Sequence, residues 1–214
     1  MSHLVLLGDS IFDNAPYVES GESVICYLKR KLPSDIQATL LAIDGSVTTD
    51  VPAQLQQLPT DATHLFLSIG GNDALQNINY LQQSAESVAE VISRFAQMIA
   101  VFRHNYLSII ESLSNQPIPK VLCTIYEPCF EQRDYQTIAS TAIKFWNDVI
   151  IQTAVAHALP VLELRQIFTD PAYANPIEPS AIGSDKLSNA ILNIVQSHDF
   201  SQNQSIIYGS SIAV

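Results

Sequence analysis

Leu4-Val5-Leu6-Leu7-Gly8-Asp9-Ser10 is the most informative stretch of the sequence. Four apolar residues in a row predict a short buried strand, and the Gly-Asp-Ser that follows predicts a turn of small residues. Such a turn places the Ser10 hydroxyl at the carboxyl end of a strand, where open α/β sheets build their ligand sites. A free hydroxyl is a poor nucleophile, so a serine at this edge reacts only if another group activates it.

Four further runs of apolar and β-branched residues predict strands of the same kind. Stretches with helical spacing separate these runs, and the two longest predict helices at about 136–157 and 183–198. Strands that alternate with helices form a parallel sheet covered on both faces. The sequence therefore predicts an α/β protein, a three-layer sandwich around a central five-stranded parallel sheet. The predicted strands are residues 3–7, 37–43, 64–69, 120–125 and 160–164.

The length of 214 residues and the apolar content of 47% suit one domain with a full core. No repeat, low-complexity tract or linker divides the chain, and we expect a single domain over residues 1–198. Residues 199–214 are rich in Gln, Asn and Ser and do not continue the pattern. This tail is expected to form an edge strand or an arm that packs on the domain or on a partner subunit, which leaves a homo-oligomer open.

The composition argues against several classes of partner. Ten Lys and Arg against 21 Asp and Glu give a net charge of −11, which repels nucleic acids and anionic membranes. No run reaches the roughly 18 apolar residues of a membrane span, and no basic leader precedes the first strand, so we expect neither a span nor a signal peptide. Cys26, Cys123 and Cys129 do not suit a disulfide framework. We interpret them as free thiols, which favours a cytoplasmic location.

Three turns follow consecutive predicted strands, and in a parallel sheet all three lie at the same edge. They contain Ser10, Gly45 and Asn72. A serine that faces a backbone N–H and a side-chain amide is the arrangement that acyl transfer needs, because such donors stabilise the oxyanion. Each turn alone also has a structural explanation, as a helix cap or phosphate-binding turn, a turn glycine and an Asx turn. Only their joint occurrence favours chemistry.

In these motifs and their order the chain resembles the SGNH (GDSL) hydrolases over nearly its whole length. The resemblance implies a flavodoxin-like sandwich and the chemistry of an esterase, lipase or carbohydrate deacetylase. It also implies that Ser10 is the nucleophile and that its own N–H, the N–H of Gly45 and the amide of Asn72 form the oxyanion hole.

The last motif departs from this family, which usually ends in Asp-x-x-His followed by Pro and Gly. The segment from Glu178 to Gly183 keeps the Pro and Gly positions, but Glu178 stands in place of the His and Asn175 in place of the Asp. An amide can donate to a carboxylate, so we expect Asn175 to hydrogen-bond Glu178. An ordinary Glu, with a pKa of about 4.3, is a weak base for a serine hydroxyl, although burial would raise this pKa.

The other polar residues offer no replacement for this base. None of the five histidines has the spacing of a catalytic relay, and no His or Cys pair has the spacing of a metal site, so we expect no metal and no cofactor. Asp9 and Asp73 are interpreted as turn and cap residues, and Tyr126 as part of either a substrate wall or a loop. Helix packing is the interpretation for Tyr135, Phe145 and Trp146. The histidines are His3, His64, His104, His157 and His198.

The sequence favours a serine hydrolase that acts on a small ester or acetylated substrate, with Ser10 as nucleophile and Glu178 as an unusual base. The alternative is a catalytically impaired protein that binds a small polar ligand in the same cleft through Glu178 and Asn175. A phosphate or nucleotide binder that uses residues 8–10 is disfavoured, because the turn has no Lys and the net charge is −11.

Overall fold

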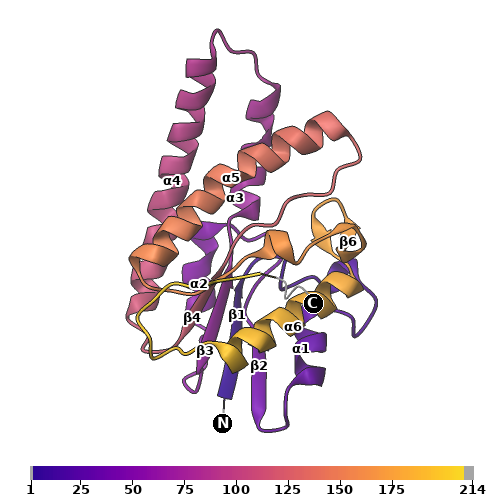
Figure 1. Cartoon of the computed structure of the whole chain (residues 1–214), viewed down its shortest axis with the longest axis vertical. Coiled ribbons are helices and arrows are strands. Elements are labelled where there is room, and N and C mark those ends of the chain that lie inside the picture. Colours follow the sequence, from indigo (N-terminus) through magenta and orange to yellow (C-terminus); the bar gives the residue numbers. More distant parts are fainter. Residues whose placement is uncertain (1, 210–214) are drawn as a thin grey trace.

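A parallel sheet forms the centre of the structure, a computed structural model that describes residues 2–209. Its strands are β1 (Ser2–Gly8), β2 (Ile36–Leu40), β3 (His64–Ser68), β4 (Lys120–Cys123), β5 (Val161–Leu162) and β8 (Ile207–Tyr208). Their order in the sheet is β2-β1-β3-β4-β5-β8, and every pairing is parallel (Figure 1). This confirms the predicted α/β architecture, and the first five strands have the flavodoxin-like order.

The sheet has one strand more than the five predicted. The additional strand, β8, comes from the tail and pairs with β5. The N–H of Val161 donates to the carbonyl of Ile206, and the N–H of Glu163 donates to the carbonyl of Tyr208. Part of the tail therefore packs on the domain as a short edge strand, while residues 210–214 lie outside the described residues.

Helices cover both faces of the sheet, as Figure 1 shows. They are α1 (Val24–Lys31), α2 (Val51–Leu55), α3 (Gly71–Leu75), α4 (Val88–Ser114), α5 (Arg133–Ala156) and α6 (Ala181–Ser197). Side chains alternate along β1, so Leu4 and Leu6 join a core cluster with residues of α1 and α6. Val5 and Leu7 face the other way and join a second cluster with residues of α2, α4 and α5. The continuous apolar run of β1 is thus explained by burial on both faces.

Short elements build the edge of the sheet where the strands end. Five are 3-10 helices and two are strands that pair antiparallel as a small hairpin, β6 with β7. Both α4 and α5 run on beyond the sheet, and the segment that contains α3 lies beside their extended ends (Figure 1). The short elements are η1 (Ala15–Tyr17), η2 (Thr48–Asp50), η3 (Ile78–Gln82), η4 (Leu164–Gln166), η5 (Asp170–Ala172), β6 (Tyr173–Asn175) and β7 (Glu178–Pro179).

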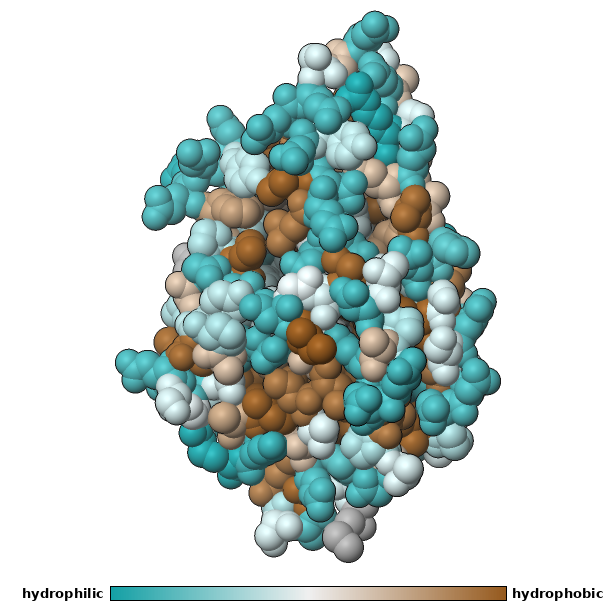
Figure 2. All heavy atoms as spheres, turned by 180° about the vertical axis from the view of Figure 1, so that it is seen from behind, coloured by the Kyte–Doolittle hydropathy of each residue, from teal (hydrophilic) through white to brown (hydrophobic). Residues whose placement is uncertain are grey.

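The surface seen from behind is mixed. Figure 2 shows hydrophilic side chains over most of the upper end and hydrophobic ones gathered in the middle and lower part. Within residues 2–209, no helix combines the length and the apolar character that a membrane-spanning helix requires.

The order in which successive strands are added to the sheet reverses at β1, because β2 lies on one side of β1 and β3 on the other. Such a switch point opens a crevice at the carboxyl ends of the strands. Gly8 ends β1 at this crevice, with φ +129°. The side-chain amide of Gln54 accepts from the N–H of Gly8 at 2.9 Å and donates to its carbonyl at 2.8 Å. The backbone that carries Ser10 is therefore fixed from both sides.

Gly8→Ala is expected to lower the free energy of unfolding by more than about 4 kcal/mol. A Cβ at Gly8 would lie 1.7 Å from the carbonyl oxygen of Ser68, and the φ of this residue is unfavourable for any L side chain. Urea unfolding measures the loss. Gly21→Ala is the matched control, since Gly21 also has a positive φ of 86° but only the end of the Arg30 side chain within 4 Å. Equal losses in the two variants would show that the clash with Ser68 is not the cause.

Candidate active site

The Ser10 hydroxyl lies next to a carboxylate, and the two residues are 168 positions apart in the sequence. Ser10 Oγ donates to Glu178 Oε1 at 3.1 Å. Ser10 follows β1, whereas Glu178 begins β7, which the β6–β7 hairpin places over the end of the sheet. Both residues are buried, with 7% and 6% of their surface exposed. The fold therefore brings the predicted nucleophile and the predicted base into direct contact.

The second turn presents a free backbone N–H. Ser46 N–H donates to the carbonyl of Ile43 at 3.1 Å, which closes a tight turn around Gly45, whose φ is +79°. A positive φ at this third position is the signature of a type II turn, and it explains the glycine. Among the described residues, the structure gives no acceptor for the N–H of Gly45 or for that of Ser10. Both donors remain available to a ligand.

Asn72 connects the second and third turns. One amide hydrogen of Asn72 is donated to the carbonyl of Ser46 at 2.9 Å, which leaves the other free. The next residue, Asp73, accepts from the N–H of Thr48 at 3.0 Å and from its hydroxyl at 2.5 Å. These bonds fix the turn of Gly45 against the start of α3. The three donors expected to form the oxyanion hole thus lie in two turns and the first turn of α3, and hydrogen bonds hold these segments in place.

Asn175 does not make the hydrogen bond expected of it. Its side chain is exposed, and its Oδ1 accepts from the N–H of Ile177 at 3.0 Å, as in an Asx turn. Glu178 Oε2 is buried and has no hydrogen-bond partner among the described residues. The bond to Ile177 holds the Asn175 side chain in the local turn, and among the described residues Ser10 is the only side chain that hydrogen-bonds Glu178.

Burial raises the pKa of Glu178 from its ordinary value of 4.5 to about 7. The hydrogen bond from Ser10 opposes this rise, and the nearby carboxylate of Asp44 adds to it. A carboxyl with a pKa near 7 exists in both protonation states at neutral pH. It can therefore accept a proton from a hydroxyl and return one to a leaving group, which a carboxylate of ordinary pKa does poorly.

Asp9 is a second perturbed carboxyl, which sequence reasoning treated only as a turn residue. Burial raises its pKa to about 8; the hydrogen bond from the N–H of Ile11 opposes the rise, and the charges of Glu178, Asp73 and Asp44 add to it. Asp9 therefore holds its proton at neutral pH. No local pattern in the sequence predicted this burial, because segments remote in the sequence produce it.

Asp9→Asn is expected to raise the free energy of unfolding by more than about 1 kcal/mol at pH 8 and by much less near pH 4. The unfolded chain ionises Asp9 near pH 4, whereas the folded chain keeps the proton to about pH 8. Between these values the folded state binds more protons, so a rise in pH destabilises it, and asparagine removes this effect.

Urea unfolding at both pH values measures the difference between Asp9→Asn and the wild type. Asp61→Asn is the control, because Asp61 is an exposed carboxyl whose pKa is lowered by its hydrogen bond to His3. A gain that is the same at pH 4 and pH 8 would contradict the assignment of a raised pKa to Asp9.

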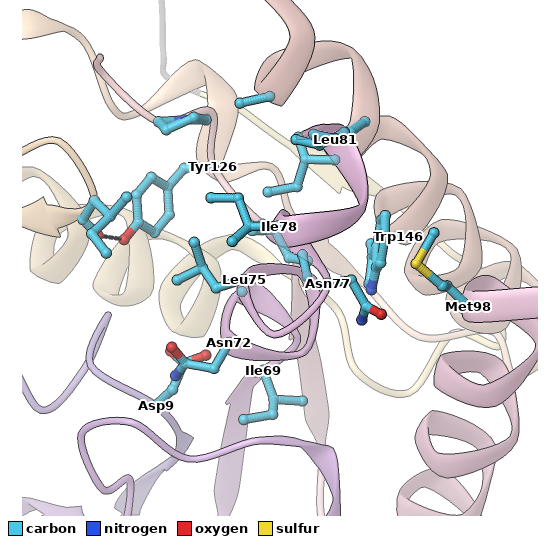
Figure 3. A pocket seen from close by; sticks show the side chains of 18 of the residues that line it. Asp9, Ile69, Asn72, Leu75, Asn77, Ile78, Leu81, Met98, Tyr126 and Trp146 are labelled. Atoms are coloured by element: carbon cyan, nitrogen blue, oxygen red, sulfur yellow. Dashed lines mark hydrogen bonds between the residues drawn. The ribbon is translucent and has the colours of Figure 1, made fainter. Parts of the chain in front are cut away.

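An apolar cavity of about 110 Å³ opens from Ser10 and Glu178 into the space between α3, η3, α4 and α5. Its wall includes Trp146, which was assigned to helix packing alone, and Tyr126, whose hydroxyl donates to the carbonyl of Ile177. Figure 3 shows Asp9 and Asn72 at one end of the cavity and Trp146 at the other. Helical periodicity predicted that Trp146 is buried, but it cannot tell a helix face that lines a cavity from one that packs against a core.

The remaining candidates lie away from this cavity. His3 is bonded to Asp61 and Thr39, and His198 to the hydroxyl of Tyr208. Within residues 2–209, no three His, Cys, Asp or Glu side chains gather as a metal site would require.

The chain matches a known protein family. Residues 6–185 match the sequence model of a family described as GDSL-like Lipase/Acylhydrolase family. No curated protein matches the sequence.

Solved structures share the fold. A lipase from a goat rumen metagenome superposes with a TM-score of 0.71 at 19% identity, covering 94% of this chain and 100% of that one. An acetyl xylan esterase superposes with a TM-score of 0.70 at 16% identity, covering 90% of this chain and 99% of that one. The extracellular lipase of Streptomyces rimosus superposes with a TM-score of 0.67 at 18% identity, covering 90% of this chain and 99% of that one. At such low identity the likeness establishes the architecture and not the substrate.

Proposed function

We propose that this chain, which belongs to the GDSL-like lipase/acylhydrolase family, hydrolyses a small carboxylic ester through a Ser10–Glu178 pair. The observation that carries the proposal is the hydrogen bond of 3.1 Å from Ser10 Oγ to Glu178 Oε1 at the mouth of an apolar cavity. A buried serine with a carboxylate on one side and free N–H donors on the other has the parts that acyl transfer requires.

In the first half of the reaction, the Glu178 carboxylate takes the proton of Ser10 as Oγ attacks the ester carbonyl carbon. The negative charge moves to the carbonyl oxygen, where the N–H groups of Ser10 and Gly45 and the free amide hydrogen of Asn72 would receive it. As the tetrahedral intermediate collapses, protonated Glu178 gives its proton to the leaving alkoxide. The alcohol departs and the acyl group remains on Ser10.

In the second half, Glu178 takes a proton from a water molecule that attacks the acyl carbon. The second tetrahedral intermediate collapses, Ser10 Oγ leaves and recovers the proton from Glu178, and the carboxylic acid is released. Glu178 carries no positive charge at any stage, unlike a histidine base. Glu178 is neutral while it holds the proton, when the negative charge is on the oxyanion, and it is negative again once it has returned the proton. The site therefore needs no group to balance an imidazolium.

The pH dependence of ester hydrolysis tests this proposal. With p-nitrophenyl acetate, kcat/KM is expected to rise about tenfold per pH unit below pH 7 and to level off above it, because only ionised Glu178 acts as base and its pKa is about 7. A fluorophosphonate should label Ser10 with the same pH profile, measured by peptide mass spectrometry. Turnover that is flat from pH 5 to pH 9, or a label on another residue, would refute the mechanism.

A catalytically impaired binding protein is the second candidate function. It is favoured by one observation: Glu178 Oε2 is buried without a partner among residues 2–209, so it could receive a donor from a ligand. If wild-type protein turns over no p-nitrophenyl ester at any pH, while polar ligands raise its melting temperature and lose this effect in Glu178→Gln, this second function replaces the first.

A further inference from the structure

The far end of the apolar cavity holds a buried hydrogen-bond donor without an acceptor. Trp146 lines the cavity and is 3% exposed, and its Nε1 has no partner among the described residues. Buried polar groups are nearly always hydrogen-bonded, so one without a partner at the wall of a cavity points to a group that the cavity receives. The reaction proposed above makes no use of this N–H.

Asn77 adds an acceptor at the same place. It lines the cavity, and Figure 3 shows its amide beside the Trp146 ring. The Nδ2 of Asn77 is committed to the carbonyl of Asp73 at 2.8 Å, whereas no described residue donates to its Oδ1. One free N–H and one free carbonyl oxygen therefore lie close together. A hydroxyl group can satisfy both, because it accepts and donates at once.

Apart from the residues around Ser10 and the tyrosines Tyr80 and Tyr126, the rest of the cavity wall is apolar, which makes Trp146 Nε1 and Asn77 Oδ1 selective for a polar group. Figure 3 shows Leu75 and Ile78 on the side of the cavity toward Tyr126, and Met98 beside the indole. A hydroxyl placed anywhere along this stretch would lose its hydration without compensation. Away from the catalytic residues the wall thus accepts an alkyl chain, and Trp146 and Asn77 together offer a polar group both a donor and an acceptor.

The distance from the oxyanion donors to this end suits a chain of medium length. Asn72 and Asn77 are five residues apart along a helical segment, in which Gln76 N–H donates to the carbonyl of Asn72 and Asn77 N–H to that of Ala74. At about 1.5 Å per residue this segment spans roughly 8 Å, which an acyl group of roughly six to eight carbons would follow.

We propose that the cavity binds a medium-length acyl group that carries a hydroxyl near its far end, which accepts from Trp146 Nε1 and donates to Asn77 Oδ1. The substrate class is then an ester of a hydroxylated medium-chain acid. This inference rests on the proposed esterase function for its role in catalysis, but the binding preference itself does not depend on turnover.

Binding is measured with Ser10→Ala, which prevents turnover, and with the fluorescence of Trp146, the only tryptophan of the chain. The probes are methyl octanoate and its analogues with a hydroxyl at carbon 6, 7 or 8. At least one hydroxylated ester is expected to bind about five- to tenfold more tightly than methyl octanoate and to change the Trp146 emission. Weaker binding of all three hydroxylated esters than of methyl octanoate would overturn the proposal. A cavity whose far end offers the hydroxyl no hydrogen-bond partner would give that result.

The matching kinetic test compares kcat/KM for p-nitrophenyl octanoate and its hydroxylated analogues. Trp146→Phe keeps an aromatic ring and removes the N–H, so the preference should fall at least about fivefold while octanoate is still hydrolysed. Phe145→Leu is the control, because Phe145 neighbours Trp146 on α5 but does not line the cavity, and it should leave the preference unchanged. A preference that survives Trp146→Phe would overturn the assignment.

The two experiments separate this inference from the proposed function. Hydrolysis that depends on Ser10 but shows no preference for a hydroxyl contradicts the acyl specificity alone. Tighter binding of a hydroxylated ester by a protein that hydrolyses none of the esters supports the cavity assignment and contradicts the esterase.

Discussion

Ser10→Ala is expected to lower kcat/KM for p-nitrophenyl acetate by about 10³-fold or more. The substitution removes the hydroxyl oxygen that carries the acyl group in the proposed mechanism, and it leaves the free N–H of Gly45 and the amide of Asn72 in place. The residual rate then measures what Glu178 and the oxyanion donors do for direct attack by water. Initial rates of the variant and the wild type are compared at pH 8, where Glu178 is mostly ionised and the wild-type rate is expected to be near its maximum.

Ser188→Ala is the matched control for this substitution. Ser188 is also a buried serine, but it lies in α6 and bonds to Lys31 and to the carbonyl of Asp185, away from the cavity. Its activity per folded molecule should equal that of the wild type. If Ser10→Ala retained wild-type turnover, the nucleophile would have to be a group other than Ser10, and the proposed mechanism would be abandoned.

The fold could be predicted almost completely from the sequence, because its determinants are local. The run from Leu4 to Leu7 buries both faces of β1, as expected of a strand in a sheet that helices cover on both sides. The sixth strand, β8, escaped firm prediction because it is two residues long and lies at an edge. Its formation depends on the free edge of β5 and on the bond of 2.7 Å between His198 and the Tyr208 hydroxyl, neither of which a local pattern contains.

The site could be predicted only in part. The turn residues Ser10, Gly45 and Asn72 follow strands, so their positions at the sheet edge are a consequence of topology. The state of the carboxyls is different, because the pKa of Glu178 and of Asp9 depends on burial by segments remote in sequence. The Asn175–Glu178 pairing was wrong for a related reason. The choice between a bond to a side chain and a local turn is decided by the exact path of the β6–β7 hairpin.

Glu178→Gln is expected to lower kcat/KM by about 10²- to 10⁴-fold, the usual contribution of a general base. Glutamine has nearly the same shape and can still accept from Ser10 through its carbonyl, but it cannot take the proton. The increase of kcat/KM with pH around pH 7 should also be lost in this variant, since the pKa of Glu178 is about 7. Full pH profiles of kcat/KM for p-nitrophenyl acetate measure both effects.

Glu163→Gln is the control, because Glu163 is a buried carboxylate bonded to Arg165 and Thr124 outside the cavity. Its kcat/KM per folded molecule should stay within about twofold of the wild type, as expected for a change away from the reacting atoms. A Glu178→Gln enzyme with the wild-type pH profile would assign that titration to another group, such as Asp9, whose pKa is raised to about 8.

Histidine at position 178 extends the same argument. An imidazole needs an acceptor behind it to hold one tautomer, and Asn175 already uses its Oδ1 to accept from the N–H of Ile177. Glu178→His alone should therefore recover less activity than Glu178→His combined with Asn175→Asp, because a carboxylate at 175 has a second oxygen to offer. Equal rates in the two variants would mean that the hairpin holds the base without help from residue 175, as it holds Glu178 in the native chain.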